Sequence, residues 1–389
     1  MSSVNTSNIP VATRGDPLAL VLSGGGARAA YQVGVLAGIA ERCGDSLSFP
    51  IVTGVSAGAI NAAALASNCH LPPAELVSQL EQAWLRMSTR KVFRAGLPAL
   101  ATTALRVAGM VLGGGRLRKL EARGLLDTEP LRRTLGERFS SEGIEANLRS
   151  GKLDALALST TSYSTGRTIT FVHAKDEVPT WRRAGRAAIR DRITVDHVLA
   201  SCALPVVFPA VAIGDEYHGD GSLRQLTPLS PAIHLGAESI LAVSVRHRPG
   251  LNEESEQRVV GYPPAAQIVG MLFNAVFLDA LEADAERVAR VNRSLRVLAS
   301  GTAHPDGLRP VRLAVVRPSR DLGQMAKGLE HHLPGSLRLL VRSLGTRGMR
   351  APDLLSYLLF ERPYLESLLE LGREDAERQW GTIAPLLER

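Results

Sequence analysis

A serine between two glycines is the residue of this chain best suited to act as a nucleophile. Ser56 lies in the pentapeptide Gly54-Val55-Ser56-Ala57-Gly58, which fits the nucleophile elbow, a sharp turn between a strand and a helix that holds a serine hydroxyl clear of the backbone. Glycines flank such a serine because side chains would collide in so tight a turn. An apolar run precedes the pentapeptide and an alanine-rich run follows it, so the pattern favours a nucleophile over a merely structural turn.

Three consecutive glycines, earlier in the chain, form a candidate site for an anion. They stand in Gly24-Gly25-Gly26-Ala27-Arg28, directly after another apolar run. Glycines at the end of a strand leave their backbone N–H groups uncovered, beside the positive end of the helix that follows. The anion could be the oxyanion of an acyl-transfer reaction, where each donor contributes roughly 2.7–4 kcal/mol to the stabilisation of the transition state. It could also be the phosphate of a bound ligand.

The phosphate alternative corresponds to a dinucleotide-binding oxidoreductase. Gly24, Gly26 and Ala29 also fit G-x-G-x-x-G/A, the fingerprint of a dinucleotide-binding turn. That fingerprint requires an acidic residue at the end of the second strand. Asp45 has a suitable distance in sequence but precedes the expected strand 49–53, whose end carries the serine pentapeptide instead. The oxidoreductase is therefore the weaker interpretation.

The base that would take the proton of Ser56 is not identified by local sequence. The chain has nine histidines, any of which could complete a Ser-His-Asp triad, but none lies in a recognisable triad signature. The competing candidate is Asp220, which stands between Gly219 and Gly221, where the freedom of glycine lets a carboxylate turn inward. The alternative is an ordinary turn aspartate, and His218, two residues earlier, could be a supporting neighbour.

These residues need strands and helices that bring them to one place. The run 18–22 is apolar throughout, as in a strand buried on both faces, and a helix is expected from 27 to about 41. Residues 49–53 predict a second strand, and a helix is expected over 59–67. Two successive strand–turn–helix units indicate an α/β fold with a parallel sheet.

Later segments extend the sheet and then become helical. Buried strands are also predicted at 153–159, 168–173, 240–245 and 311–316. A hairpin is expected to turn at Gly214-Asp215, with Asp220 in the loop after it, and Pro363 is placed to open a C-terminal helix. The chain is accordingly divided into three parts. We expect a disordered tail over 1–16, a catalytic domain over 17–320 and a helical C-terminal extension over 321–389.

Taken in order, these motifs resemble the patatin-like phospholipase family. Its signature is a G-G-G-x-R/K-G loop, a G-x-S-x-G elbow about thirty residues later and a D-G-G/A motif downstream. This chain has the glycine loop at 24–29, the elbow at 54–58 and the sequence Asp220-Gly221-Ser222. The block 200–209, with Ala-Ser-Cys-Ala-Leu-Pro and then Phe-Pro, is similar to the one that precedes the aspartate in this family.

The resemblance implies a three-layer α/β/α fold with a mostly parallel central sheet, and a serine acyl hydrolase with a Ser-Asp dyad. Ser56 would attack the ester carbonyl while Asp220 orients its hydroxyl and accepts the proton. The oxyanion hole would comprise Gly25, Gly26, Ala27 and Arg28, with Gly24, Gly54, Gly58 and Gly221 as supporting motif residues. The implied substrate is a lipid ester such as a phospholipid or lysophospholipid, and no metal or cofactor is implied. Two departures, Ala29 and Ser222, add atoms near the site without removing a reacting group.

Composition excludes several other classes of protein. With 389 residues, 45% hydrophobic and 21% charged, the chain is neither disordered nor collagen-like. The net charge of +7 is carried mainly by arginine, but no nucleic-acid-binding signature accompanies it, so no nucleic acid partner is expected. Three cysteines without metal-ligand spacing, and an N-terminus without a signal-peptide pattern, favour a reducing, cytoplasmic location.

A basic segment over 86–123 suggests contact with lipid. It carries nine Lys or Arg residues and one Glu, and its middle, 97–115, is nearly all apolar. A transmembrane helix would place Arg106 at its midpoint at a cost of about 2.5–3.5 kcal/mol. A mobile, lipid-facing cap over an acyl pocket, or a plain buried or surface helix with solvated flanks, is therefore favoured over a spanning helix, and binding at a membrane surface is favoured over insertion. A catalytically silent lipid-binding protein is the main alternative to an enzyme, and the sequence leaves the oligomeric state open.

Overall fold

The structure is a computed structural model that describes residues 17–94, 124–176, 178–248, 265–297, 304, 307–341 and 352–387. The tail expected over 1–16 and the larger part of the basic segment, from residue 95 on, lie outside the described residues.

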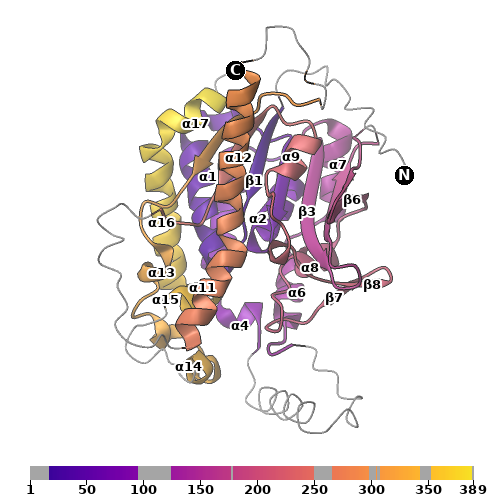
Figure 1. Ribbon diagram of the computed structural model, residues 1–389. Coiled ribbons are helices and arrows are strands. Elements are labelled where there is room, and N and C mark those ends of the chain that lie inside the picture. Colours follow the sequence, from indigo (N-terminus) through magenta and orange to yellow (C-terminus); the bar gives the residue numbers. More distant parts are fainter. Residues whose placement is uncertain are drawn as a thin grey trace.

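The described residues form a ten-stranded sheet that runs through the centre of the molecule (Figure 1). The strands are β1 (Leu18–Leu22), β2 (Ile51–Val55), β3 (Ala155–Ser162), β4 (Thr168–Ala174), β5 (Arg182–Arg183), β6 (Arg186–Arg190), β7 (Val211–Ile213), β8 (Glu216–Asp220), β9 (Ser239–Val243) and β10 (Arg312–Val316). Strands β10, β9, β1, β2 and β3 are adjacent in this order and mutually parallel. Beyond them β4 is antiparallel to β3, and β6 is parallel to β4. The hairpin of β7 and β8 is joined to the end of β3.

Helices cover both faces of the sheet. The α-helices are α1 (Ala30–Cys43), α2 (Ala57–Asn68), α3 (Pro73–Leu85), α4 (Thr89–Val92), α6 (Glu129–Gly136), α7 (Ser141–Ser150), α8 (Val195–Ser201), α9 (Ser230–His234), α11 (Ala265–Phe277), α12 (Asp279–Leu295), α13 (Leu322–Met325), α14 (Gly335–Val341), α15 (Pro352–Leu358), α16 (Arg362–Arg378) and α17 (Trp380–Leu387). Short 3₁₀ turns are η1 (Gly26–Ala29), η2 (Gly44–Ser46), η3 (Gly221–Leu223) and η4 (Glu330–His332).

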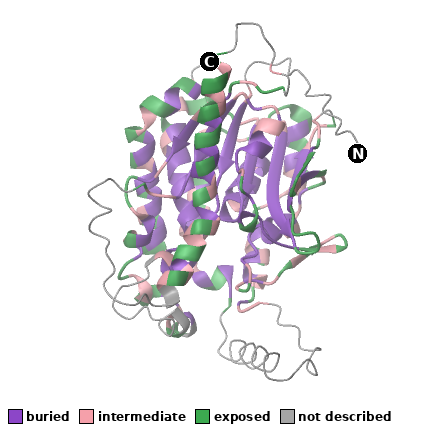
Figure 2. Ribbon diagram, viewed as in Figure 1, coloured by how far each residue is buried: buried purple, intermediate pink, exposed green. Residues whose placement is uncertain are grey.

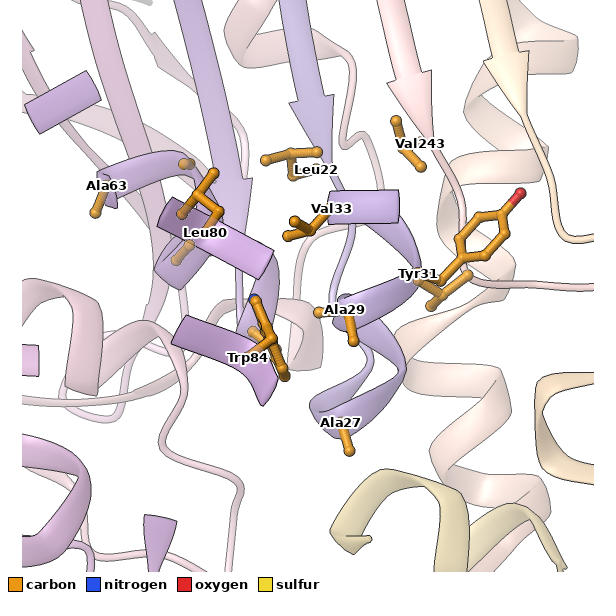
Figure 3. Close-up of a cluster of buried hydrophobic side chains, with 14 of the residues drawn as sticks. Leu22, Ala27, Ala29, Tyr31, Val33, Ala63, Leu80, Trp84 and Val243 are labelled. Atoms are coloured by element: carbon orange, nitrogen blue, oxygen red, sulfur yellow. The ribbon is translucent and has the colours of Figure 1, made fainter. Parts of the chain in front are cut away.

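Successive residues of a buried strand face opposite layers of helices. In β1, Leu18, Leu20 and Leu22 join the larger apolar cluster with α1, α2, α3 and α16, part of which appears in Figure 3. Ala19 and Val21 join a second cluster with α9 and α12. Figure 2 shows the central strands buried and the outward sides of the outer helices exposed. The expected three-layer α/β/α fold with a mostly parallel sheet is confirmed.

The C-terminal helices belong to one of these layers. Helix α16 lies against α1 so closely that an added Cβ on Gly34 would be 2.1 Å from the carbonyl oxygen of Leu369, and one on Gly372 would be 2.4 Å from that of Tyr31. Glycines on both helices allow this approach of the two backbones. Pro363 is in the first turn of α16, as predicted. Helix α16 therefore packs on α1, the helix that follows the glycine loop.

Three local expectations are corrected by the structure. The second strand is Ile51–Val55 rather than 49–53, so the first two residues of the serine pentapeptide are strand residues. Asp220 is the last residue of β8 rather than a loop residue, because β8 continues its pairing with β3 to that point. The arginine-rich sequence over 182–192 also suggests a solvated helix face, but in the structure Arg182–Arg183 form β5 and Arg186–Arg190 form β6.

Candidate active site

Ser56 occupies a strained turn between β2 and α2. Its backbone has φ 54° and ψ −134°, a left-handed conformation that residues with side chains rarely adopt and that persists only where the surroundings hold it. The two flanking glycines are required by space. An added Cβ on Gly54 would lie 2.6 Å from the carbonyl oxygen of Gly58, and one on Gly58 would lie 2.4 Å from that of Leu22. This is the geometry of a nucleophile elbow.

The pairing of two strands with β3 brings Ser56 and Asp220 together. Strand β2 runs parallel to β3 and its last pair joins Val55 to Ser159. Strand β8 runs antiparallel to β3 and its last pair joins Asp220 to the next residue, Thr160. The C-terminal ends of β2 and β8 therefore point toward each other along the same edge of β3. The residues that pair with these two ends are consecutive in β3, about 3.3 Å apart along the strand. The side chain of Ser56, the residue after Val55, meets the carboxyl group there.

Asp220 is completely buried and held by four groups. Its side chain is 0% exposed, and its Oδ1 accepts a hydrogen bond of 2.9 Å from the backbone N–H of Ser222. Its own N–H donates to the carbonyl oxygen of Ala203 at 2.8 Å, and its carbonyl oxygen accepts from the hydroxyl of Thr161 at 2.9 Å. Pairing with Thr160 completes the set. The carboxyl group is thus fixed in position, while its second oxygen, Oδ2, has no hydrogen-bond partner among the described residues.

Burial raises the pKa of Asp220 to about 7, although the nearby hydroxyl of Ser56 and the hydrogen bond from the N–H of Ser222 partly oppose the effect. The pKa rises because a charged carboxylate loses its hydration when it is buried. Among the described residues, Oδ2 has no partner within hydrogen-bond geometry, while the hydroxyl of Ser56 lies near enough to the carboxyl group to lower its pKa. Such contacts in free enzymes commonly tighten only when substrate is bound. A carboxyl group with a pKa near 7 is well matched to accept a proton at neutral pH.

Gly24 lies close to both Ser56 and Ser222, the residue two positions after Asp220. An added Cβ at this position would lie 2.8 Å from Oγ of Ser222, 2.9 Å from Cβ of Ser56 and 3.5 Å from the ring of Phe277. The departure from the family pattern at Ser222 therefore places a hydroxyl directly in the site, where it is buried and, among the described residues, has no hydrogen-bond partner. The other departure, Ala29, is fully buried, and its carbonyl oxygen accepts a hydrogen bond from the side chain of Asn61.

The rest of the glycine loop opens the short turn η1. Gly25 has φ 158° and Gly26 has φ 58°, and no side chain caps the turn. The first N–H groups of a helical turn have no acceptor within the turn, so those of Gly26 and Ala27 are available to an external anion. An added Cβ on Gly26 would lie 2.3 Å from the carbonyl oxygen of Tyr357. The loop is therefore packed directly against the backbone of α15.

Arg28 ties this loop to α15. Its Nε donates a 2.8 Å hydrogen bond to the hydroxyl of Ser356, its terminal nitrogen forms a 2.9 Å ion pair with Asp353, and its guanidinium lies 4.4 Å from the ring centre of Tyr357. The side chain of Arg28 is only 3% exposed. Its side chain thus acts as a structural support of the loop, through residues near the end of the chain that the sequence did not identify.

Two of the histidines considered as alternative bases, His197 and His218, make other contacts. His218 is paired through Nδ1 with the hydroxyl of Thr160 at 3.0 Å, and His197 contacts Asp191 and Thr194. The groups that shift the pKa of Asp220 are its own burial, Ser56 and Ser222, and no histidine is among them.

Ser201 and Cys202 contact the backbone of Ser56, but they were not among the site residues predicted from the sequence. Their only signal in the sequence was the block 200–209.

Ser56 and Asp220 are both closed to solvent in this structure, at 4% and 0% exposed. A cavity of about 400 Å³ lies between α2, α3 and α6, but neither Ser56 nor Asp220 lines it. Among the described residues, no group of His, Cys, Asp and Glu side chains is arranged to hold a metal ion. None of the helices in the described ranges combines the length and the apolar character needed to cross a bilayer.

Comparison with known proteins gives one family and several remote structures. A family model described as patatin-like phospholipase matches residues 20–233, more than half of the chain. No curated protein matches the sequence. Among solved structures, human GIVD cytosolic phospholipase A2 is 13% identical with a TM-score of 0.43, and the match covers 96% of this chain and 58% of that one.

Two bacterial structures are also similar. VipD from Legionella pneumophila is 12% identical with a TM-score of 0.29, covering 90% of this chain and 67% of its own. ExoU of Pseudomonas aeruginosa, in complex with SpcU, is 16% identical with a TM-score of 0.29, covering 88% and 75%. The chain thus spans less than two thirds of the length of the human protein and two thirds to three quarters of the bacterial ones.

Proposed function

Because the chain belongs to the patatin-like phospholipase family, we propose that it is a serine acyl hydrolase that cleaves fatty acyl esters of lipids with a Ser56–Asp220 dyad. The proposal rests on one observation: the last residues of β2 and β8 pair with consecutive residues of β3. This pairing sets a serine in a strained elbow beside a buried carboxyl group whose second oxygen has no partner among the described residues.

In the first step, the hydroxyl of Ser56 attacks the ester carbonyl and Asp220 accepts its proton. The raised pKa of Asp220, about 7, makes it a better proton acceptor than an exposed aspartate, whose pKa is about 3.9. The carbonyl oxygen becomes an oxyanion, and the N–H groups of Gly25 and Gly26, with that of Ala27, stabilise its charge. The proton then passes to the leaving alcohol as the C–O bond breaks, which leaves an acyl-serine and restores the carboxylate.

In the second step, water attacks the acyl-serine. Asp220 takes a proton from the water as it attacks, and this proton returns to Oγ of Ser56 when the fatty acid leaves. The same oxyanion hole serves both steps because the carbonyl carbon stays in the same position. No metal or cofactor enters this sequence of proton transfers.

The substrate class follows from the family: an ester of a fatty acid, such as a phospholipid or lysophospholipid. We further propose that the protein meets its substrate at a membrane surface through the basic segment 86–123, whose greater part lies outside the described residues. Nine cations against one acid would favour anionic headgroups.

The test is covalent labelling with a fluorophosphonate probe together with hydrolysis of a short-chain ester. Wild type should be labelled and active, Ser56→Ala should be neither, and Asp220→Asn should lose most of its turnover. Ser67→Ala is the matched control, because Ser67 is also buried in α2 but, among the described residues, its hydroxyl bonds to Ala63 of that helix and to Ser140 beside it. Unlabelled, inactive wild type that still binds lipid vesicles would favour the catalytically silent lipid-binding protein instead.

A further inference from the structure

Three consecutive residues at the end of α8 contact both members of the proposed dyad. Oγ of Ser201 accepts a 3.0 Å hydrogen bond from the backbone N–H of Ser56, and Sγ of Cys202 donates a 3.0 Å hydrogen bond to the carbonyl oxygen of Ser56. The carbonyl oxygen of Ala203 accepts the 2.8 Å hydrogen bond from the N–H of Asp220. We call residues 201–203 the α8 bracket.

The α8 bracket is itself firmly anchored. The hydroxyl of Ser201 donates a 2.7 Å hydrogen bond to the carbonyl oxygen of Ser159, the β3 residue that pairs with Val55. Ser201 is 0% exposed, and Cys202 and Ala203 are buried as well. The other end of α8 is closed by a capping box between Thr194 and His197. The bracket is thus fixed to the same strand on which β2 and β8 meet.

Ser56 needs such support because of its backbone conformation. A serine at φ 54° is strained, and strain of this kind persists only where neighbouring groups determine the conformation. Ser201 satisfies the peptide group before Ser56 and Cys202 the one after it, so the rotation of the serine is restrained from both sides. Burial excludes ordinary solvation of these two groups, so the N–H of Ser56 depends on the hydroxyl of Ser201. The carbonyl oxygen of Ser56 accepts from the thiol of Cys202 and also from the backbone N–H of Ala59 at 2.8 Å.

We propose that Ser201 and Cys202 are positioning residues for the reaction, which hold Ser56 at the orientation and distance from Asp220 that proton transfer requires. The inference rests on the proposed hydrolase function. Neither residue touches the substrate. Ser201 and Cys202 bond to the peptide groups of Ser56, and the backbone of Ala203 bonds to Asp220. Loss of a hydrogen bond in the α8 bracket should therefore change the distance between the serine hydroxyl and the carboxylate rather than the binding of lipid.

The thiol of Cys202 is suited to remain a donor. Burial, and then the nearby charge of Asp220, raise the pKa of Cys202 well above that of a free thiol, so the sulfur keeps its proton throughout the pH range of activity. A hydroxyl at this position can make the same hydrogen bond, whereas a methyl group cannot. A comparison of Cys202→Ser with Cys202→Ala therefore distinguishes the effect of the hydrogen bond on the rate from the effect of the volume of the side chain.

The experiment measures kcat, KM and the pH profile for hydrolysis of a short-chain ester by Ser201→Ala, Cys202→Ala and Cys202→Ser. A displacement of about 1 Å costs about a hundredfold in rate, so we expect kcat of Ser201→Ala to fall roughly 10- to 100-fold with KM changed less than about twofold. Cys202→Ala should show a smaller loss in kcat, and Cys202→Ser should restore it. Because the nearby hydroxyl of Ser56 lowers the pKa of Asp220, a displaced Ser56 should move the acid limb of Ser201→Ala to higher pH.

The control is Ser67→Ala, which removes a buried serine hydroxyl that donates to Ala63 at 2.8 Å and should lower the melting temperature without changing kcat. The inference is overturned if Ser201→Ala and Cys202→Ala keep wild-type kcat, or if Cys202→Ser is as impaired as Cys202→Ala. It is also overturned if Ser67→Ala loses as much kcat as Ser201→Ala at equal loss of stability. Should Ser201→Ala fail to fold, the Cys202 pair decides. Activity retained by Ser56→Ala would instead refute the proposed function itself.

Discussion

Arg28 donates a 2.8 Å hydrogen bond to the hydroxyl of Ser356, a residue 328 positions later in the chain. This bond joins the turn after the three glycines to helix α15, where Asp353 and Tyr357 also contact the guanidinium. The loop that would form the oxyanion hole is therefore supported by the C-terminal segment. Stability and activity should be linked through this contact.

Asp353→Ala tests that link. The variant leaves Arg28, 3% exposed, without its carboxylate, and an unpaired buried charge costs about 3 kcal/mol. We expect a corresponding loss in the free energy of unfolding by urea denaturation, and a lower kcat because the glycine loop is less firmly held.

The matched control for this variant is Glu377→Ala, which breaks an ion pair with Arg42 whose partners are 62% and 41% exposed. Pairs of that kind contribute about 1 kcal/mol or less. Equal losses in the free energy of unfolding for the two variants would show that the burial of Arg28 does not make its ion pair more important than an exposed one.

Gly24→Ala should inactivate the enzyme through a clash in the site. Its new methyl group would lie 2.8 Å from Oγ of Ser222 and 2.9 Å from Cβ of Ser56, so the nucleophile must move, and a shift of about 1 Å costs about a hundredfold in rate. Gly136→Ala is the control, because no atom of the described residues lies within 4 Å of the Cβ that it adds. We expect kcat to fall by about that factor in the first variant and to stay unchanged in the second; equal activity would show that Gly24 is not confined by Ser56.

Local patterns were sufficient to predict the elements that carry the nucleophile. An apolar run before Gly24 and another before Ser56 predicted β1 and β2, because strands of a parallel sheet are buried on both faces. The glycines of the elbow were informative for the same reason that the structure requires them, the lack of space for a Cβ. The α/β class followed from the order of strands, turns and helices alone.

The partners of those elements could not be predicted in the same way. That Asp220 ends a strand beside Ser56 depends on the register of β8 on β3, a contact between residues about sixty positions apart with no local signal. The same holds for Arg28, whose partners on α15 are more than 300 residues away. The bracket residues Ser201 and Cys202 look in sequence like any small buried residues at the end of a helix.

Charge reversal in the basic segment tests its proposed role at membranes. Replacing Arg116, Arg118 and Lys119 by Glu should weaken binding to vesicles that contain anionic lipid, since each cation near such a surface contributes about 1 kcal/mol. Sedimentation with vesicles measures the effect, and hydrolysis of a soluble ester should be unchanged. The same reversal at Arg290, Arg293 and Arg296, which are exposed on or beside α12, is the control; equal loss in both triples would indicate attraction by net charge alone.

The pKa of Asp220, about 7, predicts the pH dependence of both activity and stability. The base must be ionised, so kcat/KM should fall about tenfold for each pH unit below 7. In the unfolded chain the carboxyl returns to the ordinary aspartate pKa of 3.8, so between about pH 4 and 7 only the folded state holds the proton. Stability therefore falls as pH rises through that window, by about 1.4 kcal/mol per unit.

Asp220→Asn separates the two effects. The variant stays neutral, so relative to wild type its free energy of unfolding should increase from about pH 4 to 7 by a few kcal/mol and stay constant above, while its turnover is lost. Urea denaturation of both proteins at several pH values measures the difference. A stability difference independent of pH would contradict the raised pKa. An acid limb near 6.5 that disappears when one histidine is replaced would assign the base to an imidazole instead.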